Sequence, residues 1–194
     1  MTYTLKREEL GNGLLASVLE ALAKAYKEIG TEVYVVGAAA RDLSLKLLGA
    51  GSAPRRTMDL DVAVLLEKWD EYERLTEILI KDGFVKAPEK QRFYYCGIEN
   101  VRYEVDIVPF GDIAQEEMVA WPPEGNPVMS VRCFADVMKN ADKVSVEDRF
   151  DFRMASLSGQ WLIKLDAWCD RRLMTRKDAA DMQFILENAY ITLA

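Results

Sequence analysis

Histidine is absent from the 194 residues of this chain. Because histidine is the usual general base near neutral pH and a frequent zinc ligand, its absence excludes serine–histidine and cysteine–histidine catalysis and histidine-ligated metal sites. Only three cysteines occur, Cys96, Cys133 and Cys169, far apart and in mostly apolar or aromatic surroundings. This spacing predicts buried free thiols rather than a disulfide framework or a zinc cluster. Any catalysis must therefore use carboxylates, lysines, hydroxyl groups or a bound metal ion.

Long apolar runs are also missing, since none approaches the roughly 20 residues that a membrane-spanning helix needs. The charged segment 6–9 near the N-terminus is not a signal-peptide pattern, so we expect a cytoplasmic protein without a membrane partner. A net charge of −7 argues against tight nonspecific binding to nucleic acid. Basic clusters at 55–56 and 171–177 leave local contacts with phosphate open.

Apolar periodicity predicts the order of helices and strands. Steps of three and four residues predict helices over 7–29, 39–48, 69–81, 158–169 and 177–190. Short apolar or alternating segments predict strands over 33–36, 57–64, 93–96 and 101–108, with one or two more up to residue 131 and another at 143–146. The segment 50–54 is predicted to be a loop, and 97–100 the turn of a hairpin.

Asp59 and Asp61 are separated by one residue in the strand-like segment 57–64. Alternate side chains of a strand point to one face, so the two carboxylates face the same way, about 6 to 7 Å apart. Like charges so placed repel unless each is solvated or a cation lies between them, and a divalent metal is the obvious candidate. A third carboxylate, Asp106, lies in the later strand-like run 102–109, where the alternative is an outward-facing residue of an alternating strand. The predicted hairpin places Asp106 in the same sheet.

Gly37 follows the apolar strand and precedes a helix start, as expected where the backbone must turn closely. Strand, glycine turn, helix, Asp-x-Asp strand and a later strand aspartate is the order of the polymerase-β-like nucleotidyltransferase superfamily, which residues 30–190 resemble. The resemblance implies an α/β fold with a twisted mixed sheet flanked by helices, and C-terminal helices. Residues 1–120 would form the core with its N-terminal helix, and residues 121–194 the connecting strands and a helical part packed on it.

The resemblance also implies an activity, the Mg²⁺- or Mn²⁺-dependent transfer of a nucleoside monophosphate from a nucleoside triphosphate to a hydroxyl group. Asp59, Asp61 and Asp106 would be the catalytic metal ligands, and Asp106 would help to deprotonate the hydroxyl. The backbone at Gly37 and Ala38 would approach the triphosphate at the positive end of a helix. Ala38 departs from the Ser or Gly usual in the superfamily and offers only its backbone.

Two further segments carry resemblances of their own. Residues 37–42 (GAAARD) resemble the Gly-Gly-x-x-Arg-Asp segment of tRNA nucleotidyltransferases and bacterial poly(A) polymerases, which implies that Arg41 lies near phosphate or metal ligands. The alternative is a surface arginine paired locally. Residues 155–171 and 176–181 resemble the lysine helix and the Lys/Arg-Asp-x-x-Asp helix of predicted bacterial nucleotidyltransferases, including the abortive-infection (AbiEii/AbiGii toxin-like) type.

This second resemblance implies that Lys164 and Asp178 lie close to the nucleotide. A lysine in an otherwise apolar helix needs an anionic partner. The alternative is therefore an ion pair between Lys164 and Asp178 or Asp181 that joins the two helices.

The acceptor stays open among tRNA, a protein and a small molecule, and a cognate antitoxin protein is a candidate partner. A catalytically degenerate nucleotide-binding or regulatory protein of the same fold is the main alternative, favoured by Ala38. A sugar-nucleotide glycosyltransferase also uses an Asp-x-Asp pair, but only 58 residues precede it here. A metal-dependent nuclease usually has a lysine soon after the acidic pair, whereas the first here is Lys68.

Overall fold

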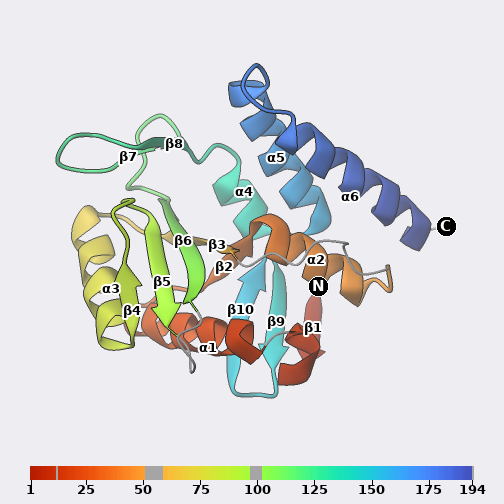
Figure 1. Ribbon diagram of the computed structural model, residues 1–194, viewed down its shortest axis with the longest axis horizontal. Coiled ribbons are helices and arrows are strands. Elements are labelled where there is room, and N and C mark those ends of the chain that lie inside the picture. The colour runs from red at the N-terminus through yellow and green to blue at the C-terminus, as the bar shows by residue number, and fades with distance from the viewer. Residues whose placement is uncertain (12, 51–58, 97–101, 194) are drawn as a thin grey trace.

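The computed structural model describes residues 1–11, 13–50, 59–96 and 102–193 (Figure 1). The strands are β1 (Thr2–Leu5), β2 (Tyr34–Val36), β3 (Asp59–Leu65), β4 (Phe84–Lys86), β5 (Arg92–Cys96), β6 (Arg102–Phe110), β7 (Met118–Ala120), β8 (Val128–Ser130), β9 (Asp142–Val146) and β10 (Phe150–Met154). The helices are the 3₁₀ helix η1 (Arg7–Leu10), α1 (Gly13–Glu28), α2 (Gly37–Leu47), α3 (Trp69–Lys81), α4 (Phe134–Lys139), α5 (Leu157–Arg171) and α6 (Lys177–Leu193).

Eight strands form one sheet in the order β1-β9-β10-β2-β3-β6-β5-β4. The pairs β1/β9, β10/β2 and β3/β6 are parallel and the remaining pairs are antiparallel, so the sheet is mixed. Strands β7 and β8 form a separate two-stranded ribbon. Helices flank the sheet, and α5 and α6 lie side by side at one end of the molecule (Figure 1). The predicted fold class, a mixed α/β sheet with C-terminal helices, is confirmed.

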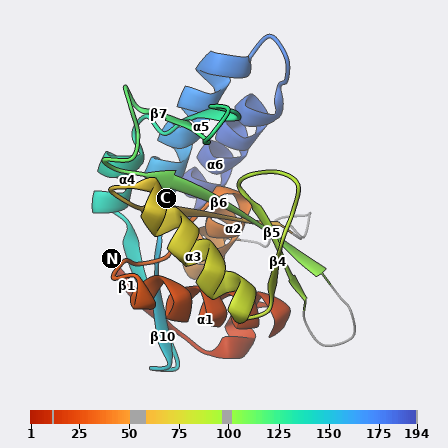
Figure 2. The same cartoon turned by 90° about the vertical axis from the view of Figure 1, so that its left-hand side faces the viewer.

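Two hydrophobic cores hold the helices to the sheet. In the larger core, α1 and α3 pack on the sheet through residues such as Leu22, Leu79 and Ile107, which are fully buried. The smaller core joins the β7–β8 region and α4 to the sheet through Phe110 and Phe134. Figure 2 shows the resulting layers, with α1 at the bottom and α5 and α6 at the top. The sheet therefore presents one face to the larger core and leaves part of the other face for polar groups.

The helix predicted over 7–29 is two elements in the structure. Residues 7–10 form the 3₁₀ helix η1, which Gly11 ends with a left-handed φ of +76°, and α1 begins at Gly13. The continuous apolar periodicity concealed this break, because side chains of η1 and α1 bury the same face. Gly30 lies just beyond α1 with a φ of +84°, as expected at the end of a helix.

The other predicted helices and strands are present, with ends shifted by a few residues, and α3 spans the predicted 69–81. The structure adds β1, β4, β7, β10 and α4, each six residues or shorter. Such elements are too short for one hydrophobic period to stand out. Residues 51–54 of the predicted loop and 97–100 of the predicted turn lie outside the described residues.

All three cysteines are free, as predicted, but the expected burial is wrong for two of them. Cys96 and Cys169 are exposed and Cys133 is half-buried. Cys96 is the last residue of β5, and Cys169 lies in the last turns of α5, so both lie away from the cores. Across the ranges that the structure describes, no helix has both the length and the apolar surface needed to cross a membrane.

Candidate active site

Four carboxylates line one face of the neighbouring strands β3 and β6. In the parallel register Asp61 lies opposite Asp106, and Asp59 lies opposite Glu104. The intervening residues point to the other face, where Leu60 is fully buried in the larger core. Period-two alternation thus separates apolar from acidic side chains on both strands. The predicted grouping of Asp59, Asp61 and Asp106 in one sheet agrees with this arrangement.

The start of α2 lies against Asp61. Strand β2 pairs antiparallel with β3 so that Val36 is opposite Asp61, and α2 begins at the next residue, Gly37. Gly37 has a φ of +67°, and a Cβ atom there would lie 2.1 Å from Asp61 Oδ2. Any side chain at this position would therefore displace the Asp61 carboxylate. No side chain caps the N-terminus of α2, and Ala38, its second residue, is half-buried.

Arg92 holds the third predicted aspartate. The Arg92 Nε atom donates to Asp106 Oδ1 at 2.8 Å, and a terminal nitrogen donates to Asp106 Oδ2 at 2.9 Å. The same guanidinium is 2.8 Å from Glu104 Oε1. Sequence reasoning missed both partners. Glu104 could have been found from its two-residue spacing to Asp106, but Arg92 becomes visible only once β5 and β6 are in register.

Burial raises the pKa of Asp61 to about 6, and the charges of Asp59 and Asp106 add to this rise. Lys164 and Lys177 act in the opposite direction and lower the pKa of Asp61. Both lysines are therefore among the charges that act on the Asp61 carboxylate. Lys177 had been noticed in the sequence only as a member of a basic cluster.

The donor set fits a hard divalent cation. Asp59 and Asp61 offer only oxygen ligands, which Mg²⁺ and Mn²⁺ prefer. A cation would relieve the repulsion between these carboxylates, which adds to the effect of burial on the pKa of Asp61. Within the parts of the chain that the structure describes, no group of three or more Asp, Glu or Cys side chains is arranged to hold a metal ion. Asp106, the predicted third ligand, is instead paired with Arg92.

The predicted Lys164 and Asp178 meet in the α5–α6 helix pair. Lys164 Nζ lies 2.7 Å from Asp181 Oδ2 and 3.5 Å from Asp178 Oδ1. Asp178 is fully buried and accepts two hydrogen bonds of 2.7 Å from Arg171, which lower the pKa of Asp178. The ion pair that joins the two helices, which was the alternative for Lys164, is thus present. Contact of Lys164 or Asp178 with a nucleotide stays a prediction.

Arg41 is also paired within the protein. Its Nε donates to Asp42 Oδ1 and its terminal nitrogen to Asp181 Oδ1, both at 2.8 Å. The guanidinium lies 5.0 Å from the centre of the Phe184 ring. Through these contacts Arg41 ties α2 to α6. The locally paired alternative for Arg41 is therefore present, and its proposed role near phosphate stays a prediction.

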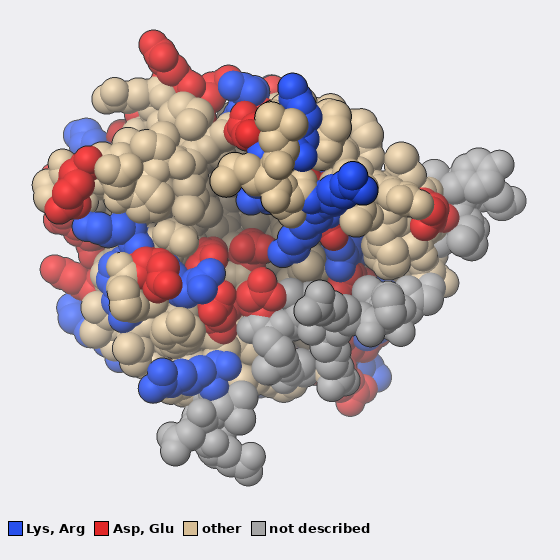
Figure 3. All heavy atoms as spheres, turned by 45° about the horizontal axis from the view of Figure 1, so that its top comes forward, with Lys and Arg blue, Asp and Glu red and all other residues tan. Residues whose placement is uncertain are grey.

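Charged side chains are unevenly distributed over the surface. Figure 3 shows a face on which Asp and Glu side chains gather in a hollow, with Lys and Arg side chains along its border. An acidic floor with a basic border is a charge pattern that can accept a cation together with a polyphosphate.

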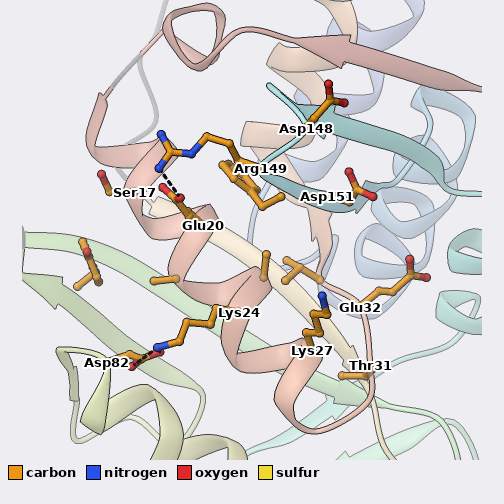
Figure 4. A pocket seen from close by; sticks show the side chains of 15 residues that line it. Ser17, Glu20, Lys24, Lys27, Thr31, Glu32, Asp82, Asp148, Arg149 and Asp151 are labelled. Atoms are coloured by element: carbon orange, nitrogen blue, oxygen red, sulfur yellow. Dashed lines mark hydrogen bonds and ion pairs between the residues drawn. The ribbon is translucent and has the colours of Figure 1, made fainter.

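The cavity of about 880 Å³ shown in Figure 4 lies elsewhere. It opens beside α1 and the start of β10, and none of the predicted site residues lines it. Two of its cations are already paired, Lys24 with Asp82 at 2.9 Å and Arg149 with Glu20 at 3.4 Å. The cavity is therefore lined by charges of both signs, four of which form pairs with one another.

Asp61→Asn is expected to change how stability depends on pH. The folded pKa of about 6 lies above the unfolded value of 3.8, so the native state loses stability as the pH rises from about 4 to 6. The shift corresponds to about 3 kcal/mol at most, which the variant should regain above pH 6. Chemical denaturation at pH 4 and pH 8 measures this difference. A control variant at the exposed Glu77, Glu77→Gln, should gain no stability above pH 6. If stability depended on pH in Asp61→Asn as it does in the wild type, the raised pKa of Asp61 would be contradicted.

The chain matches no protein-family model and no curated protein. It is similar in structure to the Thermotoga maritima CCA-adding enzyme complexed with tRNA, at 22% identity and a TM-score of 0.35, over 53% of this chain and 23% of that one. It is also similar to lincomycin-bound lincosamide antibiotic adenylyltransferase LnuA, at 14% identity and a TM-score of 0.47, over 93% and 96% of the two chains. A third similar structure is ANT(2″)-Ia in complex with adenylyl-2″-tobramycin, at 16% identity and a TM-score of 0.46, over 89% and 88%.

The chain thus spans less than a quarter of the CCA-adding enzyme and nearly the whole of the two antibiotic-modifying proteins. All three structures belong to nucleotidyltransferases, and the similarity to each is distant. The functional inferences below are accordingly drawn from the residues of this chain.

Proposed function

We propose that this chain transfers a nucleoside monophosphate from a nucleoside triphosphate to a hydroxyl group, with Mg²⁺ or Mn²⁺ as cofactor. The observation that carries the proposal is the register of β3 and β6, which sets Asp61 opposite Asp106 with Asp59 on the same face. Gly37 brings the start of α2 against Asp61. Acidic side chains beside an uncapped helix N-terminus combine a site for a cation with a site for phosphate.

Each of the proposed site residues would have a distinct role in the transfer. A divalent cation held by Asp59 and Asp61 would neutralise triphosphate charge and orient the acceptor oxygen. The backbone at Gly37 and Ala38 would donate hydrogen bonds to phosphate oxygens. Asp106 would accept the hydroxyl proton as the acceptor oxygen bonds to the α-phosphorus. The bond from the α-phosphorus to the bridging oxygen breaks, and pyrophosphate leaves.

Cations on the helices support the same assignment. Lys164 and Lys177 lie close enough to Asp61 to lower its pKa, so they are the residues best placed to meet the triphosphate charge. Lys164 is held by Asp181 and, at longer distance, by Asp178, which gives Asp178 a positioning role. Arg41 and Lys164 both pair with Asp181. We infer that Arg41 helps to orient the Asp181 carboxylate, which holds Lys164.

The acceptor class is proposed from the sequence. The resemblance of residues 155–171 and 176–181 to toxin-like nucleotidyltransferases favours tRNA or a protein, and adds an antitoxin as a candidate partner. A small hydroxylated molecule fits the net charge of −7 better than a long nucleic acid. An assay that offers all three acceptor classes separates them.

Asp59→Asn/Asp61→Asn is expected to lose transfer by at least about 100-fold, because the variant loses the charges that hold the cation. The assay incubates purified protein with each α-³²P-labelled nucleoside triphosphate, Mg²⁺ or Mn²⁺, total RNA and cell lysate. The wild-type protein should label one acceptor class. A matched control, Asp70→Asn on the exposed side of α3, should retain full transfer. Equal labelling by the double variant would overturn the proposal.

A degenerate, non-catalytic nucleotide-binding protein is the second candidate. Ala38 favours it, because alanine has no hydroxyl group for a phosphate. Metal-dependent binding of a nucleoside triphosphate without labelling of any acceptor would support this candidate.

A further inference from the structure

Arg92 completes a row of charged side chains across three strands. Asp106 is the register partner of Asp61 on β3 and of Arg92 on β5. At this level of the sheet the order is therefore Asp61, Asp106, Arg92. Two residues earlier on β3 and β6, Asp59 lies opposite Glu104 in the strand register. Glu104 Oε1 also lies 2.8 Å from the Arg92 guanidinium. Arg92 thus contacts two of the four carboxylates in this cluster, Asp106 and Glu104.

Arg92 makes a bidentate contact with Asp106, and both side chains are partly buried. Nε and a terminal nitrogen of Arg92 engage the two carboxylate oxygens at 2.8 and 2.9 Å. The side chains of Arg92 and Asp106 are 26% and 21% exposed. Two parallel hydrogen bonds from a rigid planar group fix the plane of the carboxylate, which a single contact cannot do. Each oxygen of Asp106 keeps a further lone pair for another partner.

The positive charge of Arg92 also opposes a second cation. A divalent ion at Asp59 and Asp61 would be attracted by the carboxylates and repelled by the guanidinium next to them. A triphosphate brings enough negative charge to outweigh that repulsion. The Arg92 charge would therefore weaken cation binding to the free protein and make it depend on nucleotide.

We infer that Arg92 is a positioning residue of the proposed transferase, which orients Asp106 and keeps the carboxylate cluster from binding a cation tightly before nucleotide arrives. The inference rests on the proposed function for its consequence in turnover. Its effect on cation affinity is a property of the carboxylate cluster alone.

Arg92→Met tests both roles, because methionine keeps much of the length of the side chain and removes charge and donors. Mn²⁺ binding is titrated by electron paramagnetic resonance without any nucleotide. Arg92→Met should bind Mn²⁺ at least about tenfold more tightly than the wild-type protein. Arg92→Lys, which keeps the charge, should stay within about threefold of the wild-type affinity. A control variant, Arg153→Met, removes an arginine of the same sheet that pairs with Glu32, and should leave the affinity unchanged.

Turnover should move in the opposite direction. Both Arg92→Met and Arg92→Lys should lower kcat at least about tenfold with the KM for nucleotide within about threefold, because neither fixes the plane of Asp106. A purely structural role would weaken cation binding and turnover together. Mn²⁺ affinity in Arg92→Met equal to or weaker than wild type would overturn the inference.

A second variant and a separate assay of transfer distinguish failure of this inference from failure of the proposed function. If Arg92→Met does not fold, as judged by circular dichroism, Arg92→Gln removes the charge, keeps a polar group and carries the same expectation. Tighter Mn²⁺ binding by the variant without label transfer by the wild-type protein would refute the proposed function and leave the effect of Arg92 on the cluster standing. Label transfer by the wild type, with Mn²⁺ binding unchanged in the variant, would support the proposed function and refute the effect of Arg92 on the cluster.

Discussion

Gly37→Ala is expected to abolish nucleotidyl transfer and to lower the free energy of unfolding by about 2–5 kcal/mol. A left-handed backbone costs a residue with a Cβ atom about 1–2 kcal/mol, and forced overlap in a packed site adds about 1–3 kcal/mol. At this position the new Cβ would lie 2.1 Å from Asp61 Oδ2, so the carboxylate must move. The variant therefore displaces a proposed cation ligand without removing any functional group. Denaturant unfolding and the labelling assay measure the two effects.

Gly30→Ala is the matched control for Gly37→Ala. Gly30 also has a left-handed φ, of +84°, but a Cβ atom there would meet nothing within 4 Å. This variant should lose only the backbone cost of about 1–2 kcal/mol and keep its transfer rate. If Gly37→Ala transferred as well as Gly30→Ala, the contact between Gly37 and Asp61 would have no part in activity.

Asp178→Asn is expected to lower the free energy of unfolding by about 2–4 kcal/mol at pH 7. Asp178 is fully buried and accepts both hydrogen bonds of Arg171, with Lys164 at 3.5 Å. Breaking a fully buried pair costs about 3–5 kcal/mol, and the cost here is smaller because the Arg171 side chain is 49% exposed. Thermal or denaturant unfolding of the two proteins gives the difference.

The difference in unfolding free energy between the wild type and Asp178→Asn should decrease at low pH. Hydrogen bonds from Arg171 hold the pKa of Asp178 below its usual 3.8, so the stabilisation is present above that value and is lost on acidification. The difference between wild type and Asp178→Asn should therefore shrink below about pH 4. Asp170→Asn, at an exposed neighbouring aspartate, should change stability by less than about 0.5 kcal/mol. A loss equal to that of Asp170→Asn would show that the buried pair does not hold α5 to α6.

Period-two alternation was sufficient to predict the acidic face of the sheet. It placed Asp59 and Asp61 together because one strand determines both, and the hairpin placed Asp106 in the same sheet. The same rule applied to β6 would have added Glu104, which stands two residues before Asp106 and opposite Asp59. Glu104 was omitted because only Asp106 was considered on β6.

Arg92 could not be predicted in the same way. Its partner is 14 residues away and is set by the register of β5 against β6, which depends on the turn between them. A sequence gives the two strands but not their register. Lys164 is a similar case, because helical periodicity shows which face of a helix a lysine occupies but not whether it meets a nucleotide or an aspartate of another helix.

Pairing between distant segments was also beyond the sequence. Strand β10 lies between β2 and β9, parallel to the first and antiparallel to the second. Parallel neighbours are not joined by a short turn, so no local signal marks them. The break between η1 and α1 at Gly11 was hidden for the opposite reason, since both elements bury one continuous apolar stripe.

The most direct test of the central claim compares one nucleoside triphosphate labelled with ³²P at the α position and at the γ position, in parallel reactions with the labelled acceptor class. Nucleotidyl transfer predicts that only the α label reaches the acceptor and that the γ label appears in pyrophosphate. Both should disappear in Asp59→Asn/Asp61→Asn. Transfer of the γ label to the acceptor, or release of neither label from the nucleotide, would contradict the account.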